Sequence, residues 1–218
     1  MDRFLTGAEQ RANAYKFFSE CYHLPDDELL ELLNEPPANI DLSVDVLADA
    51  APGDLEELRV DYARLFVGPF EVLAPPYGSV YLEDQDRVMT QSTEDVMDEY
   101  LREGLDVGMK EPADHVAAEL EFLYVLVVRE LEVVADDDFE RAATSLRKQK
   151  RFLDYHLGAW IEEFTDAVET NAKTDFYREL ARQTRTFVTE DAESVSDRVN
   201  QLDIEGVESA YSDWSIDV

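Results

Sequence analysis

Residues 114–131 read DHVAAELEFLYVLVVREL and decide the fold class of this chain. Their apolar side chains recur at steps of three and four residues, at Val116, Leu120, Leu123, Val127 and Leu131. That spacing places the apolar side chains on one face of an α-helix. Asp114 precedes the pattern, and a carboxylate at that position can accept hydrogen bonds from the first free N–H groups of a helix. The stretch therefore predicts a long helix that Asp114 caps.

Helical signals continue on both sides of this stretch. Further helices are predicted from Thr6 to about Tyr22, from Asp54, from Ser92 to about Leu105, from Asp137, and from Thr174 or Asp175 to about Val188. All eight prolines stand at or before Pro112, and proline interrupts helices, so we expect the longer helices in the second half. No window combines strand alternation with hairpin turns. The predicted fold class is all-α, a single compact helical-bundle domain.

Two interruptions of the helical pattern stand out. Residues 67–86, VGPFEVLAPPYGSVYLEDQD, contain three prolines among aromatic residues, and a loop of this length in a compact helical domain is usually functional. Residues 108–115, GMKEPADH, predict a hinge that would divide the bundle into two subdomains. This predicts an N-terminal helical subdomain over 1–110, a C-terminal one over 111–190, and an acidic tail over 191–218 that forms a short helix or is weakly ordered.

The charge balance excludes some classes of protein. The chain has 51 Asp and Glu against 19 Lys and Arg, a formal net charge of −32. Contacts to phosphate need Lys and Arg, which argues against nucleic-acid binding and against docking on an anionic membrane. Because the acid excess runs along the whole chain, it indicates a surface adapted to high salt, with an acidic patch for a basic partner as the alternative. We see no signal peptide and no apolar run long enough to cross a membrane, so we expect a soluble cytoplasmic protein without stable membrane insertion.

Catalytic and metal-binding signals are sparse. There are three histidines, and the nucleophile-elbow, phosphate-loop and paired-cysteine motifs are absent. His115 and Glu119 lie four residues apart beside Asp114, but no repeated ligand motif completes a metal site. We therefore expect no catalytic residue, no metal and no cofactor. The alternative is a metal- or nucleotide-dependent enzyme that uses Asp114, His115 and Glu119.

Three blocks of sequence resemble one family. Residues 61–81, DYARLFVGPFEVLAPPYGSVY, resemble the Y-x-x-L-F-x-G-P and A-P-P-Y/W-x-S-x-Y/W signature of the TorD/DmsD redox-enzyme maturation chaperones. Residues 111–115, EPADH, are similar to the E-P-x-D-H hinge of that family. Residues 152–164, FLDYHLGAWIEEF, followed by DFYRELA at 175–181, are similar to its third block. The blocks occur in the family's order.

The resemblance implies an all-helical chaperone without catalytic activity. Such a chaperone binds the twin-arginine leader peptide, the apo-catalytic subunit of a molybdopterin oxidoreductase, or both, assists cofactor loading and proofreads export. An assembly chaperone for a molybdoenzyme that is never exported is the alternative within the family. By position, the peptide-binding residues implied are Tyr62, Leu65, Phe66, Pro76, Tyr77, Ser79, Tyr81, Asp114, His115 and Glu119.

The residue types in this set match the chemistry of a twin-arginine peptide. Guanidinium groups pair with carboxylates and stack on aromatic faces, and an apolar helical stretch requires a groove. The set supplies carboxylates at Asp114 and Glu119 and aromatic faces at Tyr77 and Tyr81 for the first task, and apolar side chains at Leu65 and Phe66 for the second.

Overall fold

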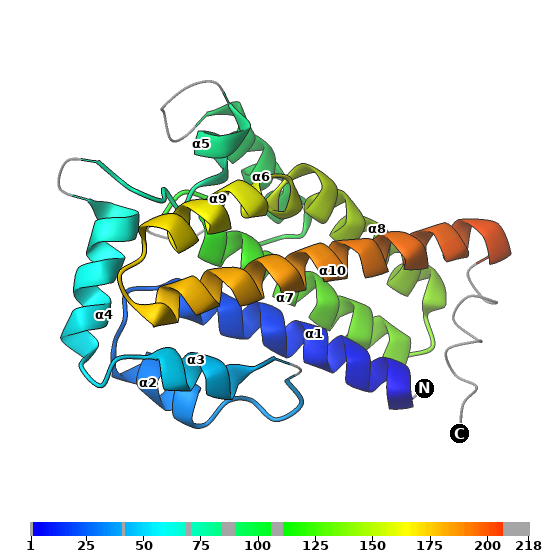
Figure 1. Cartoon of the computed structure of the whole chain (residues 1–218). Helices are drawn as coiled ribbons and strands as arrows, with labels where there is room; N and C mark the ends of the chain where they lie inside the picture. The colour runs from blue at the N-terminus through cyan, green and yellow to red at the C-terminus, as the bar shows by residue number, and fades with distance from the viewer. Residues whose placement is uncertain (1, 41, 69–70, 84–89, 106–110, 207–218) are drawn as a thin grey trace.

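The computed structural model describes residues 2–40, 42–68, 71–83, 90–105 and 111–206 (Figure 1). These residues form ten α-helices and one π-helix, and none of them lies in a β-strand. The prediction of an all-α fold is confirmed.

The first half consists of short helices after one long one. They are α1 (Asp2–Cys21), α2 (Asp27–Asn34), α3 (Val44–Ala50), α4 (Leu55–Tyr62), the π-helix η1 (Ala63–Val67), α5 (Gly78–Leu82) and α6 (Gln91–Arg102). Asp54 caps α4 as predicted, because its carboxylate accepts a hydrogen bond from the Glu56 N–H. The predicted start at Thr6 is wrong, since α1 already begins at Asp2.

The second half contains the longer helices, as the positions of the prolines predicted. They are α7 (Val116–Ala135), α8 (Phe139–Tyr155), α9 (Leu157–Asn171) and α10 (Asp175–Glu205). The cap of α7 was assigned one residue too early: His115 is the N-cap, and its Nδ1 accepts the Ala117 N–H at 3.1 Å. The cap of α8 is likewise Asp138 and not Asp137.

The last helix runs much further than the sequence suggested. α10 continues past the predicted end at Val188 and crosses the expected boundary between residues 190 and 191. Val195, Val199 and Leu202 are buried, so apolar packing holds this acidic segment in helical form. Most of the tail after Asp203 lies outside the described residues.

One core joins both halves of the chain. α1 packs along α7, α8 and α9 pack on α10, and α4 stands across one end of the bundle (Figure 1). Tyr15 and Phe18 of α1 belong to the same buried cluster as Leu123 of α7 and Phe164 of α9. Residues on both sides of the 111–115 hinge therefore share a single hydrophobic core.

Buried polar contacts reinforce this packing. Arg11 of α1 donates from Nε to Asp191 of α10 at 2.5 Å, and the Tyr15 hydroxyl donates to the same carboxylate at 2.6 Å. Gln149 of α8 donates to Glu130 of α7 at 2.8 Å. Arg11 also donates to Gln149 Oε1 at 2.8 Å, so these bonds together link α1, α7, α8 and α10.

Within the described residues, none of the helices combines the length and the apolar composition required to cross a membrane.

Candidate functional site

The two interruptions found in the sequence meet in the structure. The Val116 N–H donates to the Pro76 carbonyl and the Gly78 N–H donates to the Asp114 carbonyl, each at 2.9 Å. Tyr77 and His115 are paired between these two bonds as an isolated antiparallel bridge. The proline-rich loop and the EPADH hinge thus form one site at the start of α7.

Asp114 holds the loop at this site. Its Oδ2 accepts the Ser79 N–H at 2.8 Å, so the carboxylate stabilises the first turn of α5 and not that of α7. Asp114 and Ser79 are both buried. Asp114 Oδ1 and the Ser79 hydroxyl have no hydrogen-bond partner among the described residues.

His115 is a neutral cap at neutral pH. Burial lowers the pKa of His115 to about 4. Because Nδ1 accepts the Ala117 N–H, the neutral ring carries its proton on Nε2. The Tyr77 ring packs edge-on against the imidazole, with the ring centroids 5.3 Å apart. His115 therefore connects the loop to the start of α7 without adding a positive charge.

Glu119 lies in the core. Its side chain is fully buried, and its Oε2 accepts the Trp160 Nε1–H at 3.1 Å. Burial first, and the nearby Asp114 carboxylate as well, raise the pKa of Glu119 well above its ordinary value, although the Trp160 bond opposes this shift. Glu119 therefore does not present to solvent the carboxylate that the sequence suggested for pairing with guanidinium.

The predicted residues on η1 belong mostly to the core. Leu65 and Phe66 are buried, and the Phe66 ring lies 5.1 Å from Tyr62 and 6.1 Å from Phe164 between centroids. The Leu65 carbonyl accepts the Ala74 N–H at 2.9 Å, which ties the loop back to η1. π-Helical turns are frequent at functional sites, and this one places Tyr62 at the edge of the buried cluster.

Tyr81 extends the buried cluster to α9. Its ring stacks on Trp160 with the centroids 5.6 Å apart and the planes 15° apart. Trp160 was not among the predicted site residues, although it lies in the third family block, residues 152–164. A Cβ at Gly78 would lie 2.8 Å from Trp160 Nε1, so α5 approaches the indole as closely as a glycine allows.

Few of the predicted residues are open to a partner. Pro76, Ser79, Asp114, His115 and Glu119 are buried, as are Leu65 and Phe66, whereas Tyr62, Tyr77 and Tyr81 are partly exposed. The Tyr77 hydroxyl donates to Glu111 Oε2 at 3.0 Å, and Glu111 is exposed. Glu111 was not among the predicted site residues, although it begins the EPADH motif.

The alternative of a metal site receives no support from these contacts. Asp114 is bound to a backbone N–H, and burial raises the pKa of Glu119 well above its ordinary value, which opposes the deprotonated form that a metal ligand needs. In the described ranges, no three His, Cys, Asp or Glu side chains are grouped so that they could hold a metal ion.

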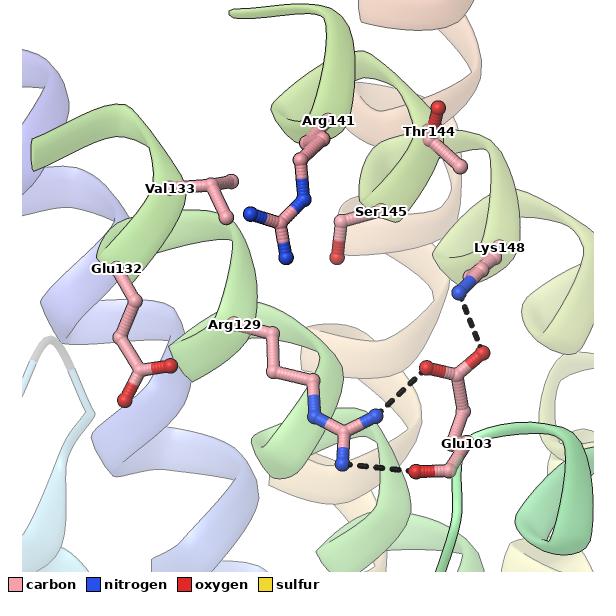
Figure 2. Close-up of a pocket in the computed structure, with 8 residues that line it drawn as sticks. All are labelled: Glu103, Arg129, Glu132, Val133, Arg141, Thr144, Ser145 and Lys148. Carbon is pink, nitrogen blue, oxygen red and sulfur yellow. Dashed lines mark hydrogen bonds and ion pairs between the residues drawn. The ribbon is translucent and has the colours of Figure 1, made fainter. Parts of the chain in front are cut away.

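A separate pocket of about 400 Å³ lies between α7 and α8, near the end of α6 (Figure 2). Arg129, Arg141 and Lys148 line it, which is notable in so acidic a chain. Arg129 and Lys148 both point to Glu103 (Figure 2). Their ion pairs with this carboxylate measure 2.6 and 2.5 Å. Two of the three cationic side chains are therefore already paired with Glu103. We interpret these ion pairs as a structural link between α6, α7 and α8.

Replacing Glu119 by glutamine is expected to stabilise the protein at neutral pH. A raised carboxyl pKa means that wild-type stability is complete below the unfolded pKa and is lost as the pH rises towards the folded pKa. Glutamine can still accept the Trp160 N–H and has no charge to bury, so we expect a gain of about 1–3 kcal/mol at pH 7.5 that shrinks towards pH 4.5. Urea unfolding at several pH values measures this gain in stability.

Glu121→Gln on the same helix is the control. It removes a part-exposed partner of Lys16 and should change stability by less than about 0.5 kcal/mol. A loss of stability in Glu119→Gln at pH 7.5 would show that the carboxylate is ionised.

The chain is similar in sequence to known proteins. Residues 28–166 match the family model described as the nitrate reductase delta subunit. Chaperone protein TorD of Vibrio parahaemolyticus is 29% identical over 129 residues, which cover 58% of each chain. Chaperone protein TorD of Aeromonas salmonicida is 27% identical over 215 residues, 90% of this chain and 96% of that protein.

A solved structure extends the likeness to the fold. The putative redox enzyme maturation protein from Archaeoglobus fulgidus is 26% identical, with a TM-score of 0.59 over 82% of this chain and 93% of that chain. TorD of Aliivibrio fischeri, 31% identical over 136 residues, aligns over 61% of both lengths. This chain therefore aligns with about three fifths of the TorD proteins from Vibrio and Aliivibrio named here, and with nearly the whole of the Aeromonas protein.

Proposed function

We propose, from the premise that this chain belongs to the nitrate reductase delta subunit family, that it is a cytoplasmic chaperone for a molybdopterin oxidoreductase. Its partner would be the twin-arginine leader of that enzyme, the apo form of its catalytic subunit, or both. In this role it assists cofactor loading and delays export until loading is complete. The names of the relatives, a chaperone and a maturation protein, support the proposal.

One observation carries the proposal: the loop and the hinge are joined backbone to backbone and leave tyrosine rings at the surface. Tyr77 is half-buried between His115 and Glu111, and Tyr62, the last residue of α4, is also partly exposed. Partly exposed aromatic side chains on a rigid support are typical of recognition surfaces. The hydrogen bonds of the Pro76 carbonyl and the Gly78 N–H fix the backbone on both sides of Tyr77, which lowers the entropy lost on binding.

The alternative of an enzyme is less well supported. A nucleophile, base or metal ligand at this site would need an ionisable group that is free to react. Asp114 binds the loop, His115 caps a helix, and Glu119 binds Trp160. All three side chains support the structure of the site, which suits binding better than catalysis.

Titration with leader peptides tests the proposal. We expect the wild-type protein to bind the leader of a twin-arginine molybdoenzyme from the same genome, and Tyr77→Ala to bind it about 30-fold more weakly, as for a hot-spot aromatic residue. Tyr155→Ala, an exposed tyrosine on α8, should leave the affinity unchanged. Calorimetry measures both variants, and thermal melts confirm that they are folded.

Two outcomes would count against parts of this reading. If the wild-type protein binds no leader but does bind the apo-catalytic subunit, the chaperone serves an enzyme without an exported leader. If it binds neither, the proposed function is wrong.

A further inference from the structure

We propose that Tyr77 and Glu111 form a clamp that binds one guanidinium group of the partner peptide. This Tyr–Glu clamp rests on the proposed function and assigns the arginine to Glu111, where the sequence pointed to Asp114 and Glu119. Guanidinium is planar and forms two parallel hydrogen bonds with a carboxylate while its face stacks on an aromatic ring. Glu111 supplies the carboxylate and Tyr77 supplies the ring.

Tyr77 and Glu111 are in contact at the surface. The Tyr77 hydroxyl donates to Glu111 Oε2 at 3.0 Å, which orients the carboxylate. Burial first, and then the hydrogen bond and the charge of Glu111, raise the pKa of Tyr77. Tyr77 is partly exposed and Glu111 is exposed, so a side chain from solvent can reach the clamp.

The clamp has an oxygen available for a cation. Among the described residues Glu111 forms no ion pair, and the Tyr77 bond uses only Oε2, so Oε1 is open to a second donor. Burial keeps the adjoining His115 neutral at neutral pH, so the imidazole does not compete for the carboxylate. A cation at Glu111 Oε1 would therefore form a charge-assisted hydrogen bond and leave the Tyr77 bond to Oε2 in place.

The other two acidic residues at the site cannot take this role in the same way. Asp114 is buried, and its Oδ2 holds α5 through the Ser79 N–H, so a guanidinium would have to enter the core to reach the unpaired Oδ1. Glu119 is fully buried against Trp160, and burial raises the pKa of its carboxyl well above the ordinary value. Bringing a guanidinium to either carboxyl would bury a charge at a cost that surface pairing avoids.

The test compares a leader peptide with an otherwise identical peptide in which both arginines are lysines. Lysine keeps the charge but offers neither a planar face nor a bidentate fork. We expect the wild-type protein to prefer the arginine peptide by about tenfold, and Glu111→Gln to bind it about tenfold more weakly with little preference left. Glu57→Gln removes the same charge from an exposed position on α4 and should retain both affinity and preference. Tyr77→Phe keeps the ring, removes the bond to Glu111 and should give a partial loss.

The outcomes separate the clamp from the proposed function. If Glu111→Gln binds as the wild type does and keeps its preference for arginine, the clamp is wrong and the chaperone function is untouched. If Glu57→Gln loses as much affinity as Glu111→Gln, long-range attraction by the net charge explains the effect and the clamp is again wrong. If the wild-type protein binds neither the leader peptide nor the apo-catalytic subunit, both proposals fail.

Discussion

Replacing Asp61 by alanine is expected to lower the free energy of unfolding by about 3–5 kcal/mol, because it removes a buried acceptor and leaves its hydrogen-bond donors unpaired. Asp61 is buried at the end of α4. Its Oδ2 accepts the N–H groups of Lys173 and Thr174, each at 2.8 Å, and the Thr174 hydroxyl at 3.0 Å, while Oδ1 pairs with the partly exposed Arg64 at 2.8 Å. These bonds connect α4 to the start of α10.

A neighbouring aspartate provides the control for this experiment. Asp54 caps the other end of α4 and accepts one backbone N–H at 2.9 Å in an exposed position. Asp54→Ala should cost only about 0.5–2 kcal/mol. Urea unfolding at neutral pH compares the two variants. If Asp61→Ala costs no more than Asp54→Ala, the contact between α4 and α10 is not a main support of the fold.

Acid titration gives this prediction a second readout. Burial alone would raise the pKa of Asp61, but the Thr174 and Lys173 bonds and Arg64 outweigh it and lower the pKa. A lowered pKa contributes stability that is complete above the unfolded value, near 3.9, and is lost as the pH falls through the folded value. The gap in stability between the wild type and Asp61→Asn should therefore narrow below about pH 4. This is the opposite sign to that expected for Glu119.

The fold could be predicted from the sequence because helical spacing is a local signal. The apolar positions from Val116 to Leu131 and the absence of proline after Pro112 were sufficient to identify the long helices. The end of α10 could not be predicted, since acidic residues after Asp191 hide the widely spaced Val195, Val199 and Leu202, which only packing on other helices makes helical. Cap positions were missed by one residue because Asp114 and His115 can both accept an N–H.

The candidate site was predicted as a set of residues but not as an arrangement. The loop and hinge blocks are adjacent in space, as their joint occurrence in one family implied. Which of the predicted residues face solvent depends on tertiary contacts. Glutamate is usually a surface residue, yet Glu119 is buried against Trp160. Glu111 was overlooked for the converse reason, because only its bond from Tyr77 distinguishes it from many other exposed acids.

α5 is in close contact with α9 and with the hinge, but several buried polar atoms around it lack a hydrogen-bond partner among the described residues. Gly78 packs on the Trp160 ring, and the Asp114 carboxylate accepts the Ser79 N–H. Beneath the same short helix, buried polar atoms of Ser79, Tyr81, Asp114 and Glu119 have no hydrogen-bond partner among the described residues. Each such atom opposes burial by about 1–3 kcal/mol, so the position of α5 depends on its packing against Trp160.

Gly78→Ala is therefore expected to destabilise the protein by about 1–3 kcal/mol and to move α5 away from α9. The added Cβ would lie 2.8 Å from Trp160 Nε1, too close for either group to stay in place. Gly7→Ala in α1 meets no atom within 4 Å and should be neutral or stabilising by up to about 1 kcal/mol, because alanine favours helix.

Trp160 itself reports whether the expected movement of α5 occurs. The chain has a second tryptophan, Trp214, so Trp214→Phe is the background in which Trp160 fluorescence is measured. Gly78→Ala should shift the emission towards that of a solvated indole, whereas Gly7→Ala should not.

A double-mutant cycle gives a second test. Trp160→Phe removes the crowded ring nitrogen, so Gly78→Ala should cost less stability in that background than in the wild type. An unchanged emission maximum together with full additivity would mean that α5 absorbs the methyl group locally. The close contact with Trp160 would then not control the position of the loop that carries Tyr77.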